Sequence, residues 1–278
     1  MVESMYLELE TVTPLFMYGA DQNHPEIRAA SIKGVMRWWW RAVAAEENIK
    51  KLRTEEIEIF GSTDKKSSFF LSIDIIEKFN PIKYRLLPYG TKKFELPSIP
   101  PGYKFGVKIQ SDSELKSAYN IFKLAILLGG FGKRSRRGSG SVTLNDWNFK
   151  NVDDIFKIIT AILNYFKDDF SSNGRSIIRK RNIDGGATPY PFITKITIGK
   201  PTYSAEDLRV KIGEASHNHS NPSLGNGVPR MASPVYVSIV KISDKYAPVV
   251  TELNCAFPPG YQRADIRKQM DFVKEVLK

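Results

Sequence analysis

The chain has 278 residues, of which 42% are hydrophobic and 26% charged, so its composition gives no reason to expect a disordered protein. Its 41 Lys and Arg residues exceed its 30 Asp and Glu residues, and the net charge of +11 favours an anionic partner, either nucleic acid or an acidic protein surface. The single cysteine, Cys255, excludes an intramolecular disulfide framework and a zinc cluster of several thiolates. No apolar run approaches the ~20 residues that a membrane span requires, and we expect a cytoplasmic protein with no membrane partner.

Four strands are predicted in the first half of the chain. Apolar residues recur at every second position over 5–11, 69–75 and 103–109, which is the period of a half-buried strand. A shorter apolar alternation at 142–144 marks the fourth strand. A Pro-rich stretch, 88–101, separates the second strand from the third.

Two helices lie between these strands. Ser31 can cap the first helix, whose apolar positions continue at helical spacing to Val43. Ser111 and Glu114 match a capping box at the start of the second helix, which ends at Gly129. The resulting order, βαββαβ, describes a ferredoxin-like domain, which has an antiparallel sheet with helices on one face. Many proteins with and without RNA-binding activity share this fold, so it does not identify a function.

The second half starts again with an amphipathic helix over 152–166. Residues 174–195 are rich in Gly, Pro and basic side chains, and we expect a long exposed segment with little regular structure. Another polar loop is expected over 213–229. Two strands and a last helix are predicted near the C-terminus: 235–242, 249–253 and 266–277.

These elements predict an α+β chain of two domains. The first, residues 1–150, is expected to be a ferredoxin-like domain. The second, residues 151–278, is expected to be a more degenerate ferredoxin-like domain with long loops.

A cationic ridge is predicted on the first helix. Lys33, Arg37 and Arg41 fall on one flank of a helical wheel, away from the apolar core stripe. Trp38 and Trp40 border this ridge, so phosphate-pairing groups sit beside aromatic faces that we expect to be exposed or half-exposed and able to stack on bases. The alternative is that the tryptophans pack against a neighbouring helix while the charges are only solvated.

A second cationic cluster lies in a glycine-rich loop, residues 129–140. Lys133, Arg134, Arg136 and Arg137 sit there among five glycines, which let backbone amides approach an anion closely. The spacing excludes a nucleotide-binding P-loop. Four like charges in one loop repel one another, and a bound polyanion would neutralise them. The alternative is a flexible hairpin-like connection with solvated charges.

Three segments of this sequence carry a family resemblance. Residues 27–42, preceded by Thr13-Pro14-Leu15, resemble the signature of RAMP proteins, the RNA-binding subunits of CRISPR complexes. The tryptophan-rich form of this segment is similar to that of the subunit-one family of the Cmr (type III-B) complex. The loop 129–140 resembles the glycine-rich loop of RAMP proteins, and 230–234 resembles a motif before a C-terminal strand of the same subunit family.

This resemblance implies two ferredoxin-like domains and a non-catalytic subunit near the end of a ribonucleoprotein filament that acts in antiviral RNA interference. The implied partners are the 3′ part of the CRISPR guide RNA, the target RNA and other RAMP subunits of the Cmr complex. No cofactor and no metal are implied. Backbone subunits of such complexes cut RNA with an aspartate between the first strand and first helix. Asp21 lies in the corresponding loop, but its surroundings do not match those of the cutting subunits.

Two alternatives stay open. A metal-independent RAMP endoribonuclease would use a histidine as general base, and the candidates are His24, His217 and His219. His217 and His219 are also a weak candidate for a metal site, since no third ligand is identifiable. A protein-interaction subunit would instead dock acidic neighbours on its basic surface.

Further basic residues in the expected exposed segment, Arg175, Arg179, Lys180 and Arg181, would extend an RNA track or dock an acidic subunit. The full set that we expect to bind RNA, without reading its sequence, consists of Arg28, Lys33, Arg37, Trp38, Trp40, Arg41, Lys133, Arg134, Arg136, Arg137, Arg175 and Arg179.

Overall fold

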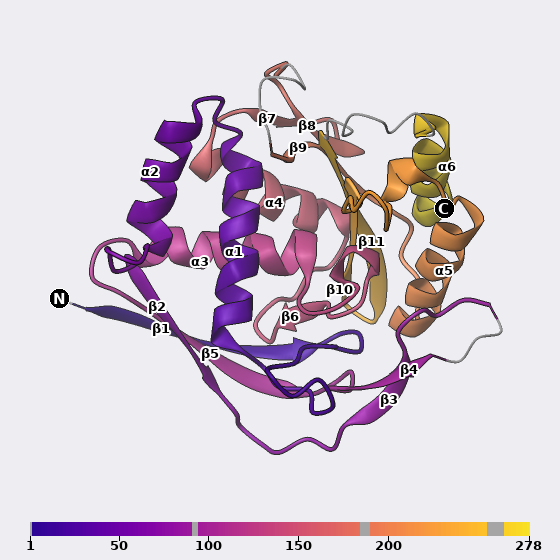
Figure 1. The fold of residues 1–278 in the computed structure, drawn as a ribbon, viewed down its shortest axis with the longest axis horizontal. Helices are drawn as coiled ribbons and strands as arrows, with labels where there is room; N and C mark the ends of the chain where they lie inside the picture. The colour runs from indigo at the N-terminus through magenta and orange to yellow at the C-terminus, as the bar shows by residue number, and fades with distance from the viewer. Residues whose placement is uncertain (1, 91–93, 184–189, 255–263) are drawn as a thin grey trace.

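The computed structural model describes residues 2–90, 94–183, 190–254 and 264–278, so Cys255 lies outside the described residues. It contains two large antiparallel sheets and a separate two-stranded hairpin. Figure 1 shows the N-terminal sheet along one side of the molecule, with helices packed between it and the second sheet. No helix in the described ranges is long and apolar enough to cross a membrane.

The N-terminal sheet has four strands in the order β2-β5-β1-β6. Their bounds are β1 Glu3–Thr11, β2 Phe69–Asp74, β5 Lys104–Ser111 and β6 Val142–Leu144. Helices α1 (Ala29–Ala44) and α3 (Leu115–Leu124) contact this sheet, and α3 continues as a π-helical turn to Gly129. The alternating apolar residues of the strands face these helices: Leu7, Leu9, Phe69, Leu71, Phe105, Val107 and Ile109 are buried.

The C-terminal sheet has five strands in the order β10-β11-β9-β8-β7. Their bounds are β7 Phe170–Ser172, β8 Ser176–Arg179, β9 Phe192–Ile198, β10 Val235–Ile242 and β11 Lys245–Asn254. Its helices are α4 (Val152–Phe166), α5 (Ala205–Asn218) and α6 (Ile266–Leu277). Because α4 contacts α1 and α3, the largest apolar core continues across residue 150 into this sheet, while α5 and α6 enclose a smaller core on β10 and β11.

Three elements interrupt the order expected for the first half. Helix α2 (Ile49–Phe60) follows α1, and the hairpin of β3 (Ile82–Arg85) and β4 (Glu95–Ser98) stands between β2 and β5. Helix α2 carries little amphipathic pattern for a prediction to use, because only Leu52 and Phe60 of its 12 residues are buried. In Figure 1 the hairpin reaches toward α5 of the C-terminal half, and the Arg209 side chain donates to the Arg85 carbonyl at 2.9 Å.

The caps of the two N-terminal helices differ from the predictions. Helix α1 begins one turn earlier than expected, with Arg28 as its N-cap, so the prediction that Ser31 caps it is wrong. The hydroxyl of Ser111 accepts the Glu114 N–H at 3.0 Å, as a capping box requires of its first residue. Glu114 is itself the N-cap of α3 and makes no side-chain cap bond, so only half of the box forms.

Both loops expected in the second half are partly regular. Strand β8 and the start of β9 lie within 174–195, and Ile177 and Arg179 are buried there, so the prediction of an exposed segment is wrong for these strands. The expected loop 213–229 begins inside α5, since that helix continues to Asn218 despite the glycine at position 213. Tertiary packing overrides the local composition in both places.

A buried ion pair ties the C-terminal sheet to the end of α1. The Arg179 guanidinium lies 2.5 Å from a carboxylate oxygen of Asp169, and both side chains are buried. The same guanidinium donates to the carbonyls of Val43 at 3.0 Å and Ile193 at 2.7 Å. It therefore pairs with a carboxylate and donates all of these hydrogen bonds within the fold, so it is not available to a ligand.

We predict that Asp169→Ala lowers the free energy of unfolding by about 3 kcal/mol, because it leaves the Arg179 cation buried without its counter-ion. Urea denaturation followed by circular dichroism measures this change. The adjacent Asp168→Ala is the control, since the Asp168 side chain is 83% exposed and its ion pair with Lys180 lies at the surface. Equal effects of the two substitutions would contradict the account.

Candidate nucleic-acid interface

Two arginines of the α1 ridge hold α2 in place. The Nε atoms of Arg37 and Arg41 each lie 3.4 Å from a carboxylate oxygen of Glu56. Arg37 also donates to the carbonyls of Phe60 at 3.0 Å and Gly61 at 2.9 Å, at the end of α2 where helix carbonyls lack intrahelical partners. Both guanidinium groups are thus engaged inside the protein and are only about one-third exposed.

The third cation of the ridge is engaged as well. The Lys33 ammonium donates to the Ser67 hydroxyl at 2.5 Å and lies 4.7 Å from the centre of the Phe69 ring. Burial, and then the nearby Arg37 charge, lower the pKa of Lys33. The ridge therefore faces α2 and the segment that leads into β2.

The two tryptophans that border the ridge have different surroundings. Trp40 is only 6% exposed and its ring centre lies 6.2 Å from that of Phe60, so the expectation of an accessible stacking face is wrong for Trp40. The cause is α2, which covers it. Trp38 is half-buried where α1 meets β10, 5.0 Å from the ring of Tyr236, and the guanidinium of Arg136 lies 5.5 Å above it. The structure thus brings Trp38, but not the ridge, to the glycine-rich loop.

The glycine-rich loop is a tightly held structure and not a flexible connection. The Lys133 N–H donates to the Phe16 carbonyl and the Gly138 N–H to the Val237 carbonyl, each at 2.8 Å. Gly132 has φ +80°, and a Cβ there would collide with the Phe16 backbone. The loop is therefore clamped between the segment after β1 and strand β10.

Arg137 is buried within this loop and is not available to a phosphate. Its guanidinium donates only to neutral oxygens: Ser216 Oγ at 3.1 Å, Val235 O at 2.8 Å, Ser233 Oγ at 2.9 Å, Leu224 O at 3.3 Å and Arg136 O at 2.8 Å. Burial lowers the pKa of Arg137 to about 9, so the group is still a cation at neutral pH. The expected RNA contact at Arg137 is replaced by a link between the loop and the C-terminal half.

The neighbouring cations of the loop are less buried than Arg137, since Lys133 is exposed and Arg134 and Arg136 are half-buried. Arg136 lies 4.4 Å above the Tyr236 ring and donates to the Ser233 carbonyl. Arg134 has a left-handed backbone, its Nε has no hydrogen-bond partner within the described ranges, and burial lowers its pKa. Lys133 is exposed above the Tyr18 ring. Among the residues that the structure describes, no carboxylate forms an ion pair with Lys133, Arg134, Arg136 or Arg137.

A polar cavity of about 610 Å³ opens beside these arginines. Its walls come from the glycine-rich loop, from the turn after β3, and from α5 with the loop that follows it. Tyr89 and His217 stack at this cavity, with ring centres 4.8 Å apart and planes inclined by 19°. The remaining lining is rich in hydroxyl and amide groups: Ser135, Ser216, Ser220, Asn221, Asn226 and Ser233. We call this the arginine cavity.

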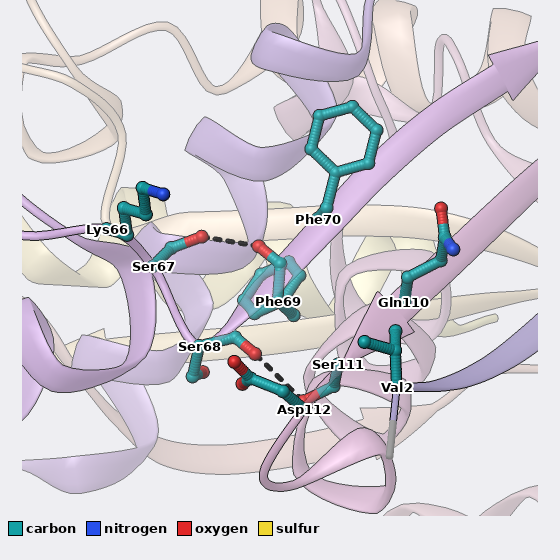
Figure 2. A pocket seen from close by; sticks show the side chains of 9 residues that line it. All are labelled: Val2, Lys66, Ser67, Ser68, Phe69, Phe70, Gln110, Ser111 and Asp112. Atoms are coloured by element: carbon teal, nitrogen blue, oxygen red, sulfur yellow. Dashed lines mark hydrogen bonds between the residues drawn. The ribbon is translucent and has the colours of Figure 1, made fainter.

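A different hollow, of about 440 Å³, lies at the outer edge of β2 (Figure 2). Phe70 is 63% exposed there and Ser111 donates its hydroxyl to the Ser68 carbonyl. One cation, Lys66, and one carboxylate, Asp112, line it. Since these charges balance, this hollow offers no electrostatic preference for an anion.

The other expected contacts are scattered. Arg28 pairs with Glu26 at 3.1 Å at the surface before α1. Arg175 is exposed in the turn between β7 and β8. Arg179, as described above, is buried. Arg181 donates to the Ala45 carbonyl at 3.1 Å.

The three histidines do not gather. His24 pairs with Asp21, whose pKa is lowered chiefly by the hydrogen bond from His24, at an exposed site. His219 lies 2.6 Å from Glu275, and only His217 reaches the arginine cavity. In the described part of the chain, no three His, Cys, Asp or Glu side chains are placed to hold a metal ion together.

Comparisons with known proteins identify the family of this chain. The profile of the RAMP superfamily matches residues 8–143. The CRISPR system Cmr subunit Cmr1-2 of Pyrococcus furiosus is 34% identical in an alignment of 178 positions that covers 51% of this chain and 95% of that protein. This chain belongs to the Cmr1 family of the RAMP superfamily.

Other relatives extend this result to the fold. The Cmr subunit Cmr1-1 of the same organism is 32% identical in an alignment of 172 positions that covers 53% of this chain and 49% of that protein. The crystal structure of apo Cmr1 from P. furiosus superposes with a TM-score of 0.66 at 18% identity, over 99% of this chain and 96% of that one. A chain of the type III-B Cmr-beta complex bound to cognate target RNA gives 0.64 at 14% identity, over 98% of both.

Sequence reasoning missed several residues of the arginine cavity in this Cmr1 family member. Tyr89 lies in the Pro-rich stretch, where nothing in the sequence indicates that it meets α5. The sequence suggests His217 only as a general base or metal ligand. Its position beside the arginines depends on α5, a helix that the apolar spacing does not predict. Both contacts are long-range, so local spacing carries no signal for them.

We predict that Arg137→Met destabilises the protein by about 3 kcal/mol, because the substitution leaves several buried oxygens of the C-terminal half without their donor. Thermal or urea unfolding measures the loss. Lys133→Met, in the same loop but exposed, is the matched control and is expected to change stability by less than about 0.5 kcal/mol. A neutral Arg137→Met variant would show that the buried guanidinium does not fix the loop.

Proposed function

We propose that this chain is a non-catalytic RNA-binding subunit of a type III-B Cmr ribonucleoprotein complex. The observation that carries the proposal is the arginine cavity, which the half-buried Arg134 and Arg136 line beside the buried Arg137. No carboxylate in the described part of the chain neutralises them. Cations held together in this way repel one another, and a phosphate backbone would relieve that repulsion.

The named relatives support an RNA partner. One structural neighbour belongs to a Cmr-beta complex that is bound to cognate target RNA. By extension, we propose target RNA, CRISPR guide RNA near its 3′ part, and other RAMP subunits of the Cmr complex as partners of this chain. Pairing between guide and target would supply sequence specificity, while this chain holds backbone phosphates.

The surroundings of each residue divide the expected contacts into two groups. The RNA-binding set that we propose is Arg28, Trp38, Lys133, Arg134, Arg136 and Arg175. The other members have internal roles: Lys33, Arg37 and Arg41 hold α2 and the segment after it, and Trp40, Arg137 and Arg179 are buried. Trp38 remains in the set because it is half-buried and the Arg136 guanidinium lies over its ring.

We further propose two ferredoxin-like domains, residues 1–150 and 151–278. The order β2-β5-β1-β6, with α1 and α3 as the connecting helices, supports the first. A degenerate ferredoxin-like domain in the second half is supported by the chain order β9, α5, β10, β11, α6. Strand β11 lies between β10 and β9 in the sheet, as the third strand of a ferredoxin-like domain does. The last strand of the βαββαβ order is absent after α6 in the described residues, and β8 pairs with β9 at the position that this strand would take.

We predict that the purified chain binds single-stranded RNA with a salt dependence set by about three cations, Lys133, Arg134 and Arg136. The slope of log K against log salt is then roughly −2, and affinity falls about 20-fold between 50 and 200 mM salt. Replacing Arg134 and Arg136 together by Gln is expected to weaken binding at least about tenfold and to bring the slope to about −0.7. Fluorescence anisotropy with unrelated RNA sequences measures both quantities.

The matched control is Arg53→Gln with Arg267→Gln, which removes the same charge from exposed sites on α2 and α6. If both double variants weaken binding equally, net charge alone explains the interaction. Absence of RNA binding by the folded wild-type chain at physiological salt would instead favour a protein-interaction subunit that docks acidic neighbours.

One observation favours a second candidate function, a metal-independent endoribonuclease. His217 lines the same cavity as Arg134 and Arg136, so a general base would stand beside cations able to stabilise a phosphorane. We predict that the purified chain does not cleave RNA with or without divalent metal. Reproducible cleavage by the wild type that is lost in His217→Ala, and retained in His24→Ala and Asp21→Ala, would overturn the non-catalytic proposal.

A further inference from the structure

The arginine cavity is larger than a phosphate group needs. Arg134 and Arg136 occupy one wall, whereas Tyr89 and His217 belong to another, formed by the hairpin turn and α5. A volume of about 610 Å³ is in the range of sites that enclose a small organic ligand. The cavity therefore has room for a base in addition to the RNA phosphate that the arginines would hold.

The aromatic pair offers a stacking surface in this cavity. Tyr89 and His217 already lie almost parallel, 4.8 Å apart, and His217 is exposed while Tyr89 is half-exposed. A third flat ring can continue such a stack, and every nucleobase has a face that suits it. To bind here, a base of an RNA strand would have to unstack from the adjacent bases of that strand.

Two amide groups in the lining have unused hydrogen-bonding atoms. Asn221 accepts the N–H groups of Ser223 and Asp265 through Oδ1, at 3.0 and 2.9 Å, and its Nδ2 has no partner among the described residues. Asn226 donates through Nδ2 to the Val228 carbonyl at 2.7 Å, and its Oδ1 likewise has none there. Both residues line the cavity, so its wall includes one donor and one acceptor without a partner among the described residues, and the edge of a base can use both.

We propose that the arginine cavity takes a single nucleotide out of the bound RNA strand. The phosphate lies against Arg134 and Arg136, and the base stacks on the Tyr89–His217 pair with its edge toward the two asparagines. This inference rests on the proposed RNA-binding function and adds to it a contact with one base. The chain then holds RNA through a base as well as through its backbone, so that removing bases from the strand weakens binding.

The test compares two probes, a uridine 12-mer and a 12-mer of the same ribose-phosphate backbone without bases, on the full chain. The wild type is expected to prefer the uridine probe by roughly 5- to 50-fold, the range that one stacked base supplies. Tyr89→Ala is expected to reduce this preference at least about threefold, because it removes the stacking partner, while Tyr89→Phe, which keeps the ring, retains it. Tyr203→Ala, at a tyrosine that is 72% exposed and outside the cavity, is the control.

The outcomes separate this inference from the function on which it rests. If Arg134→Gln with Arg136→Gln weakens both probes and Tyr89→Ala leaves the preference unchanged, the backbone site stands and the nucleotide pocket is wrong. If the variant with Gln at positions 134 and 136 binds both probes as tightly as the wild type does, the proposed RNA-binding function itself is contradicted. A preference lost equally in Tyr203→Ala would also overturn the pocket. Circular dichroism confirms that each variant is folded.

Discussion

The buried guanidinium of Arg137 is the interaction on which the rest of the site depends. This side chain extends from the glycine-rich loop of the N-terminal half. It donates hydrogen bonds to carbonyl and hydroxyl oxygens of residues between 216 and 235 in the C-terminal half. Because those acceptors are neutral, the charge is solvated but not cancelled. The loop is thereby fixed with its two adjacent arginines directed along the cavity, and the local potential stays positive.

Residues from both halves of the chain line the arginine cavity. The hairpin of β3 and β4 supplies Tyr89, helix α5 supplies His217, and the glycine-rich loop supplies the cations. The apolar core likewise continues from the N-terminal sheet into β8, β9 and β11, so the two halves do not pack as independent bodies. Structural relatives keep this overall shape at 14–18% identity, which shows the fold but does not transfer side-chain roles to this chain.

Much of the fold followed from periodicity, and the surroundings of the charges did not. The apolar alternation predicted β1, β2, β5 and β6 and the helical spacing predicted α1, α3, α4 and α6, because each buries one regular face. The wheel also placed Lys33, Arg37 and Arg41 correctly on one flank. It could not show that α2, with few buried residues of its own, covers that flank. Nor does sequence distinguish Arg136 from Arg137, since the partners that receive the Arg137 guanidinium lie about 80 to 100 residues further along the chain.

The most direct test of an RNA site at the arginine cavity is ultraviolet cross-linking of the full chain to single-stranded RNA, followed by mass spectrometry of the attached peptides. The account predicts cross-links on peptides that contain residues 133–136 and on those that contain Tyr89 or His217. Cross-links confined to peptides from α1 and α2, with none in the glycine-rich loop, would contradict it.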